Sequence, residues 1–488
     1  MATSSLGEPR TGRHIVHRLS TVATSRSART ELLVAHHRRM SDARGSLWFK
    51  PALAVLVALA AGAALSQVQV GPDSWLWKVS FRASANDARQ VLTVIIGALI
   101  PVTSLVFALT VVTLQIASTQ FSPRLLRTFL RDRGTQLVLS VFVGTVAFSL
   151  ACLFTIDTGT SDPTPDVPRL AITVALVLAL VCIGMLVFYF GHITNAVRID
   201  TVMRQVEDDT RRTLEREHPL VRGETLDPDR VETVEAPAHA IVVSAPVDGY
   251  VQGVDPRLPA LTVRKKVTVI VLPLIGYYTV AGRALALAWS DDGSPLKPTT
   301  LDAIARLIEI DPERRVERDV GLGVRQLVDI TTRAMSTGQN DPYTGTQAVH
   351  HLTSLLVDAA RRSFATQVFH DPDGPVRLIV PVMNFPTHLR VVCGHIRQGG
   401  LERHPRVVLE LLRMLGVLGE AVSTEARAAA VRQEVDVLIT DARRMIQSPS
   451  DLHEVLQLGD EVRQQLGPVG EITTPVGATA AWAGVAQP

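Results

Sequence analysis

Known catalytic and metal-binding motifs are absent from the sequence. It contains no GxSxG nucleophile turn, HExxH zinc motif, P-loop or GxGxxG dinucleotide fingerprint. The three cysteines, Cys152, Cys182 and Cys393, have no spacing that suggests a disulfide framework or a metal site. We therefore expect no enzymatic activity, no cofactor and no bound metal.

Polar residues with a regular spacing lie instead in a long apolar segment, 91–116, and just beyond it. At helical spacing they form two stripes. The first stripe contains Ser104, Gln115, Ser118 and Ser122, and the second contains Thr103, Thr110 and Thr113. Such side chains usually hydrogen-bond to neighbouring helices or to their own backbone. The alternative is that they line a pore or a substrate path, which small hydroxyl and amide groups would suit.

A basic segment follows this apolar segment. Residues 121–133 place phenylalanine and leucine side chains on one face of a predicted amphipathic helix, whose first turn is a capping Ser-Pro pair. Arg124, Arg127 and Arg131 lie on the other face. We expect these arginines to fix the topology and to bind the anionic headgroups of membrane lipids. The alternative is that they line a cytoplasmic vestibule or contact the cytoplasmic domain.

A second polar motif, Asn-Asp-Pro at 340–342, follows a glycine and precedes a predicted helix. Aspartate as N-cap and proline in the first helical position account for it as a joint between two helices. The alternative is a polar cytoplasmic pocket that binds a small ligand or an ion. Its candidate residues are Arg325, Asn340, Asp341 and either His350 or His351. Two adjacent histidines on a helix cannot both face one site, so zinc is not expected.

The elements that must position these residues begin with four apolar segments. Residues 51–70, 91–116, 137–156 and 170–191 contain no acidic or basic side chain. Each is about as long as the hydrocarbon core of a bilayer requires. The sequence therefore predicts an integral membrane protein with four transmembrane helices.

The distribution of arginine between these segments predicts the orientation. The first 46 residues form a basic arm, predicted to be disordered, with no apolar core or cleavage site of a secretory signal. The connection at 117–136 is also basic, whereas the connection at 157–169 carries three aspartates and one arginine. The positive-inside rule then places both termini in the cytoplasm, in a bacterial inner membrane. A net charge of only +2 argues against nucleic acid as a partner.

The cytoplasmic part divides by pattern into several regions. Residues 194–220 continue the fourth span as a helical stalk with charges of both signs, either solvated or paired with its copy in an oligomer. Residues 238–290 form short β-branched runs that resemble a small barrel-sandwich module of the biotinyl and lipoyl type, without an evident attachment lysine. Residues 300–445 are predicted to form an α-helical domain, interrupted by a strand at 376–382. The tail at 468–488 is predicted to be disordered.

Two long motifs resemble one known family. They are LVFALTVVTLQIASTQFSPRLLRTFLRDRGTQ, from Leu105 to Gln136, and ERDVGLGVRQLVDITTRAMSTGQNDPYTGTQAV, from Glu317 to Val349. In this order they resemble the predicted membrane proteins of the domain-of-unknown-function 2254 family, over roughly residues 45–435. The resemblance implies four spans and a cytoplasmic region, and it implies no established activity.

These observations support two hypotheses of different kinds. The first is a pore-forming or transport-like homo-oligomer regulated by its cytoplasmic domain, based on the polar stripes, the stalk and the large cytoplasmic region. The second is a membrane-anchored scaffold or sensor that conducts nothing and binds a cytoplasmic ligand or protein. Flux through a bilayer separates the two.

Overall fold

The computed structural model describes nine stretches of the chain. They are residues 48–68, 84–118, 132–156, 168–196, 198–221, 227–232, 234–371, 374–399 and 403–467. These residues belong to two compact units. The described residues up to Ala196 form the membrane unit, and those from Arg198 onward form the α/β unit.

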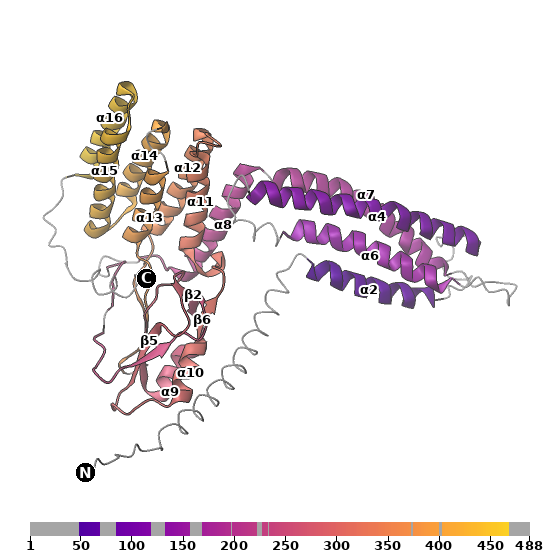
Figure 1. Cartoon of the computed structure of the whole chain (residues 1–488), viewed down its shortest axis with the longest axis horizontal. Coiled ribbons are helices and arrows are strands. Elements are labelled where there is room, and N and C mark those ends of the chain that lie inside the picture. Colours follow the sequence, from indigo (N-terminus) through magenta and orange to yellow (C-terminus); the bar gives the residue numbers. More distant parts are fainter. Residues whose placement is uncertain are drawn as a thin grey trace, which may run out of the picture. The chain divides into compact units, whose positions relative to one another are not determined.

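Four helices long and apolar enough to cross a membrane make up the membrane unit (Figure 1). They are α2 (Phe49–Ser66), α4 (Ala85–Ile116), α6 (Arg133–Thr155) and α7 (Arg169–Ala196). Each contains one of the four predicted apolar segments, apart from residues 67–70 and 156 at their ends. The prediction of four membrane-spanning helices is thus confirmed. The predicted basic arm, the tail and most of the 121–133 helix lie outside the described residues.

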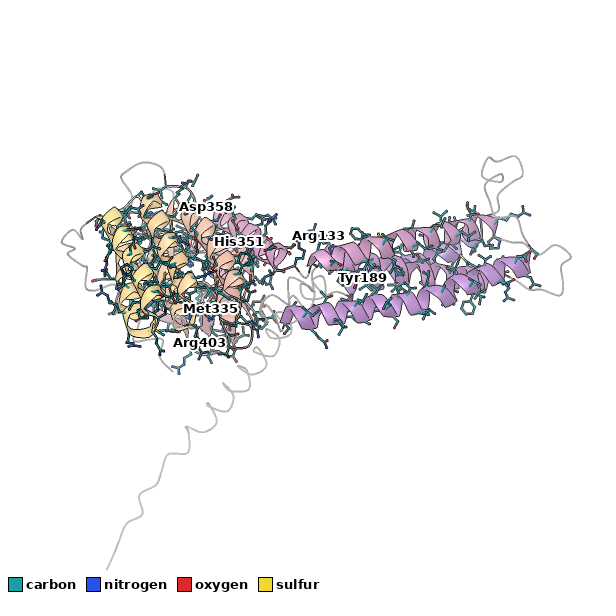
Figure 2. The ribbon with its side chains drawn as sticks, turned by 90° about the horizontal axis from the view of Figure 1, so that it is seen from above. Arg133, Tyr189, Met335, His351, Asp358 and Arg403 are labelled. Carbon is teal, nitrogen blue, oxygen red and sulfur yellow. The ribbon has the colours of Figure 1, made fainter. Side chains whose placement is uncertain are left out.

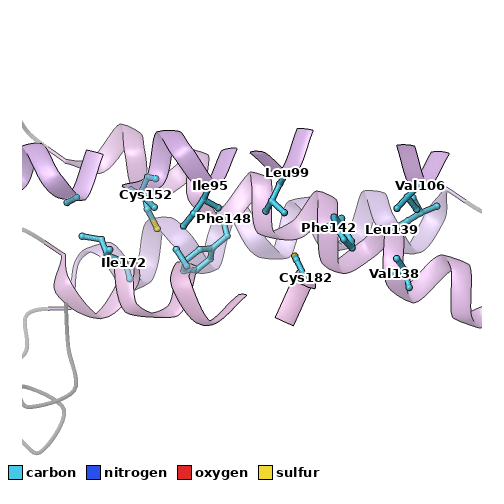
Figure 3. Packing of buried hydrophobic residues seen from close by; sticks show 14 of the residues in the cluster. Ile95, Leu99, Val106, Val138, Leu139, Phe142, Phe148, Cys152, Ile172 and Cys182 are labelled. Carbon is cyan, nitrogen blue, oxygen red and sulfur yellow. The ribbon is translucent and has the colours of Figure 1, made fainter. Parts of the chain in front are cut away.

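Helix α6 is the centre of this bundle. In its most apolar stretch 56% of the residues are buried, against 11% in α2 and 22% in α4 and in α7. Its side chains Leu139, Phe142 and Phe148 fill the space between the helices (Figure 3). The other three helices therefore surround α6 and turn most of their surface outward.

The α/β unit begins with helix α8 (Ile199–Glu217). The chain was expected to continue as one helix from the fourth span, but Arg198 has extended backbone angles and starts a new helix. The apolar side of α8, including Val202, Met203 and Leu214, is buried in the α/β unit. At one crossing, a Cβ on Gly323 would lie 1.8 Å from the Thr210 hydroxyl oxygen, so only glycine fits there. The amphipathic sequence of α8 explains why one side of this helix is buried and the other is exposed.

Two open β-sheets follow, and no closed barrel forms among the described residues. The five-stranded sheet has the order β1 (Ile241–Ser244), β5 (Ala284–Ser290), β3 (Val267–Val271), β8 (Val376–Val380) and β7 (Gln367–His370). The three-stranded sheet has the order β4 (Tyr278–Thr279), β2 (Gly249–Val254) and β6 (Ile308–Asp311). The expectation of a barrel-sandwich module is corrected, because three of these eight strands come from outside 238–290.

Strand β3 explains why the module is not self-contained. All five of its residues are buried, which is the pattern of a central strand covered on both faces. It pairs antiparallel with β5 on one edge and parallel with β8 on the other. The strand predicted at 376–382 as an isolated interruption is therefore a sheet strand that joins distant parts of the chain.

Two helices also depart from the expected pattern. The run at 261–272 was expected to be a strand, but residues 261–265 lie in α9 (Arg257–Lys265), where Leu258 and Thr262 are buried one turn apart. Lys266 ends this helix in the left-handed conformation. Helix α10 (Pro298–Leu307) stops at Leu307, and the residues that continue its pattern form β6.

Six further helices pack side by side as the helical part of the unit (Figure 1). They are α11 (Val320–Ala334), α12 (Pro342–Ala360), α13 (Phe385–Gln398), α14 (Pro405–Ala421), α15 (Glu425–Met445) and α16 (Pro449–Leu466). A short 3-10 turn, Val316–Arg318, precedes α11. Proline in the first turn of α12, α13, α14 and α16 fixes where each begins. Helix α16 extends the predicted domain beyond residue 445.

Candidate functional site

The predicted polar stripe on α4 lies on the outer surface of the membrane unit. Ser104 and Gln115 are exposed and Ser118 is half-buried. Ser122, Arg124, Arg127 and Arg131 lie outside the described residues, so the basic part of this candidate site has no described position.

The outward surface of α4 contains one row of small and polar residues beside the exposed side chains of Val94, Ile100, Leu105 and Val112. On α4 an exposed row at helical spacing contains small or polar residues with one valine: Gln90, Thr93, Gly97, Pro101, Ser104, Ala108, Val111 and Gln115. The large exposed residues of α7 are aliphatic or aromatic: Val177, Leu180, Val181, Ile183, Val187, Phe188 and Phe190. The α7 surface suits lipid tails, whereas the α4 row suits helix contact or water.

The second stripe of α4, the threonines, has a structural explanation. Thr103 and Thr113 donate hydrogen bonds to the carbonyls of Leu99 and Leu109, at 2.7 and 2.8 Å. Thr110 is buried, and its hydroxyl lies 2.7 Å from the Tyr189 hydroxyl of α7. Of the two explanations given for the polar stripes, hydrogen bonds or a pore lining, these threonines show the first. They bond to their own backbone or to a neighbouring helix.

An ionisable pair at the start of α6 was not predicted. Asp132 caps α6 by accepting hydrogen bonds from the backbone of Gly134 and Thr135. The His192 Nε2 of α7 lies 2.6 Å from an Asp132 carboxylate oxygen. The ring occupies the space beside Gly134, where a Cβ would lie 2.5 Å from Nε2. An Asp-x-Gly-Thr cap in the sequence signals the helix start, but nothing local indicates the histidine partner. Figure 2 labels the neighbouring residues Arg133 and Tyr189 in this unit.

The Asn-Asp-Pro motif forms a helix cap. Asp341 accepts hydrogen bonds from the backbone nitrogen and the hydroxyl of Thr344, at 3.2 and 2.6 Å, and Pro342 is the first residue of α12. Asn340 adopts a left-handed conformation at φ 49°. Arg325 pairs with Asp329 on its own helix at 3.0 Å. Of the four candidate pocket residues, only His350 lines the groove found nearby.

That groove, of about 540 Å³, lies along α12 with α8 and α14 as its walls. Its lining residues are Arg211, His350, Thr353, Ser354, Val357, Asp358, Arg361, Glu410, Arg413, Met414 and Val417. The residues from α12 recur at intervals of three and four and so share one helical face. Sequence reasoning missed the groove because its walls are far from α12 along the chain. Arg211 of α8 is about 140 residues from its α12 partner Ser354, and Glu410 of α14 is 60 residues from its α12 partner His350.

Charged pairs tie the three helices together around the groove. His351 Nδ1 lies 2.5 Å from a Glu207 oxygen on α8, and His350 Nε2 lies 2.7 Å from a Glu410 oxygen on α14. Arg211 donates to Glu207 at 2.6 Å and to the Ser354 hydroxyl at 2.8 Å. Burial raises the pKa of Glu207, but the hydrogen bonds from His351, Arg211 and Ser354 outweigh it and lower the pKa. The adjacent histidines thus face different helices, as helical geometry requires. Figure 2 labels His351 and Asp358 on this part of the unit.

A second ionic group is buried and structural. The Arg427 side chain of α15 is fully buried and binds Asp229 through contacts of 2.5 and 3.0 Å. It also donates to the carbonyls of Ala360 and Arg362 and lies 4.9 Å from the Phe385 ring centre. This arginine therefore joins α15, the end of α12 and the segment before β1.

The remaining groups do not form a catalytic or metal constellation in the described part of the chain. No set of three or more histidine, cysteine, aspartate or glutamate side chains there could hold a metal ion. His388 of α13 is buried, and burial, with the nearby His218 and Arg314, lowers its pKa to about 3. A histidine held neutral in this way contributes to packing.

Comparisons with known proteins agree with this architecture. Residues 44–416 match the sequence model of a family described as predicted membrane protein, DUF2254. Uncharacterized proteins of Mycobacterium tuberculosis H37Rv and Mycobacterium bovis are each 33% identical over 471 residues, covering 96% of this chain and 88% of theirs. No solved structure matches the chain. The family resemblance of the two motifs is thus confirmed: the chain belongs to the DUF2254 family of predicted membrane proteins.

Proposed function

We propose that the chain is a subunit of a homo-oligomeric pore or transport-like protein of the cell membrane. In this proposal the exposed row of α4 lines the path or the contact between subunits, and the cytoplasmic α/β unit regulates it. The observation that carries the proposal is the exposed row of small and polar residues along α4, from Gln90 to Gln115, which Val111 alone interrupts.

The packing inside one subunit favours a path between subunits. Buried apolar side chains of α6 fill the centre of the single bundle. Polar side chains that face lipid tails lose their hydrogen bonds to water, at a cost of several kcal/mol for each unsatisfied group. An assembly that turns Ser104 toward another subunit or toward water removes this cost.

Chain connectivity supports a regulatory role for the α/β unit. Helix α8 begins three residues after α7 ends. It is held by Arg211 and Glu207 to α12 and by the close approach of Thr210 to Gly323. A ligand that changes the packing of α8 would act on the part of the chain that follows the fourth span in sequence. The predicted contact of the 121–133 segment with anionic lipid completes the proposal.

Flux measurements test the function. The purified protein is reconstituted into liposomes, and ion and solute flux is recorded across voltages and osmotic steps. Gln115→Leu and Ser104→Leu should alter the flux, because both replace a polar side chain of the α4 row by an apolar one. Val187→Leu, on the exposed surface of α7, is the matched control and should leave it unchanged. Silent bilayers under all conditions would refute the pore and favour the non-conducting scaffold or sensor.

A further inference from the structure

The groove between α8, α12 and α14 has a charge pattern that the proposed pore does not use. Arginines from three different helices reach it: Arg211 from α8, Arg361 just after α12, and Arg413 from α14. Ser354 and His350 add a hydroxyl and an imidazole from its floor. Because the three arginines come from α8, the end of α12 and α14, they can surround one group rather than line a flat face.

The carboxylates of the groove are already neutralised by partners. Glu410 lies 2.7 Å from both His350 and Arg413. Asp358 pairs with Arg362 at 3.0 Å and with Arg211 at 3.4 Å. The groove is lined by two carboxylates, Asp358 and Glu410, and by three arginines, which leaves one positive charge in excess without counting histidine.

Arg361 is the cation available to a ligand. Its side chain is exposed, and its guanidinium has no hydrogen bond or ion pair to the residues that the structure describes. Val357, Met414 and Val417 give the groove an apolar part. A fork of donors beside an apolar surface fits an oxyanion attached to an organic group.

We infer that this groove binds the phosphate group of an organic ligand, either a small phosphorylated molecule or a phospholipid headgroup. Among the arginines of the groove, Arg361 and Arg413 have the fewest hydrogen bonds and ion pairs within the described part of the protein, so they supply the main donors. Arg211, which also holds Glu207 and Ser354, gives the bound phosphate a connection to α8.

Binding to the full-length protein in a neutral detergent tests the inference. Pyrophosphate is the probe for a soluble ligand. Short-chain phosphatidylglycerol, with phosphatidylcholine of the same chain length as reference, is the probe for a lipid headgroup. Calorimetry should show saturable binding of pyrophosphate, or of phosphatidylglycerol in preference to phosphatidylcholine, and the probe that binds identifies the source of the phosphate.

The matched variants are Arg361→Gln and Arg212→Gln. Loss of a charged hydrogen bond should weaken binding at least about tenfold in Arg361→Gln. Arg212 is a 71% exposed arginine of α8 outside the groove, so Arg212→Gln should bind like the wild type. Equal unfolding temperatures of both variants confirm that folding is intact. The inference is overturned if neither probe binds saturably, or if the two variants weaken binding equally.

Discussion

Replacing Arg427 by methionine should destabilise the α/β unit strongly. The substitution removes both contacts to Asp229, whose side chain is only 9% exposed, and the donors to the carbonyls of Ala360 and Arg362. Removing one partner of a buried ion pair costs about 3–5 kcal/mol, because the other charge stays buried without its counter-ion. Because the carbonyl oxygens of Ala360 and Arg362 also lose a donor, we expect a free-energy cost toward the upper end of this range.

The assay is thermal unfolding of the purified full-length protein in detergent. For a unit of this size, each kcal/mol lowers the midpoint by roughly 2–4 °C, so a decrease of roughly 6–20 °C is expected. Arg463→Met is the matched control, since this arginine also forms two ionic contacts, to Asp436 and Asp460, but is 38% exposed. Exposed pairs contribute about 0–1 kcal/mol, so this control should shift the midpoint by only a few degrees.

A double-mutant cycle checks the stated cause. Asp229→Asn keeps the oxygen that accepts from the Phe385 backbone nitrogen at 2.9 Å but removes the charge. The variant that combines Asp229→Asn with Arg427→Met should therefore be clearly more stable than the sum of the two single costs implies. The reasoning fails if Arg427→Met lowers the midpoint no more than Arg463→Met does.

Three further expectations concern packing, pH and topology. Gly323→Ala should destabilise the α/β unit by about 1–3 kcal/mol in chemical denaturation, because its Cβ would overlap Thr210, whereas Gly338→Ala has no atom within 4 Å and should cost far less. His388 has a pKa of about 3 in the folded state and near 6.5 in the unfolded state, so between these pH values only the unfolded chain binds the proton. The stability should therefore fall as the pH decreases from 6.5 toward 3, by about 1.4 kcal/mol for each pH unit. Melting curves at pH 7.5 and 5.5 should show a smaller decrease for His388→Gln, and an equal decrease would contradict the assignment. Fluorescent and phosphatase fusions at both termini should report a cytoplasmic location, and an active phosphatase fusion at either end would contradict the predicted orientation.

Local patterns predicted the elements whose causes are local. The four apolar segments contain no charge and had to be membrane helices, and the capping role offered for Asp341 and Pro342 is the one their geometry shows. One continuous run of apolar residues is enough to predict a membrane-spanning helix. A few neighbouring residues are enough to predict where a helix begins. Such features can be read from a single sequence.

The remaining features depend on contacts between distant residues. Strand β8 joins β3 across about a hundred residues, so the sequence of 238–290 alone suggested a closed module. The pair of Asp132 and His192 and the groove of Arg211, Arg361 and Arg413 likewise arise only when separate helices pack. Helix α9 was missed because it has only nine residues, and because its run at 261–263, taken together with 267–272 across the basic residues 264–266, has the composition of one strand.

The proposed pore is tested most directly by chemical modification of the α4 row during a flux measurement. Gln115→Cys is suitable because the three native cysteines are buried. A charged methanethiosulfonate reagent should change the flux through liposomes that contain Gln115→Cys, and it should leave Val187→Cys and the wild type unchanged. Flux through Gln115→Cys that persists unaltered after complete labelling would contradict the account.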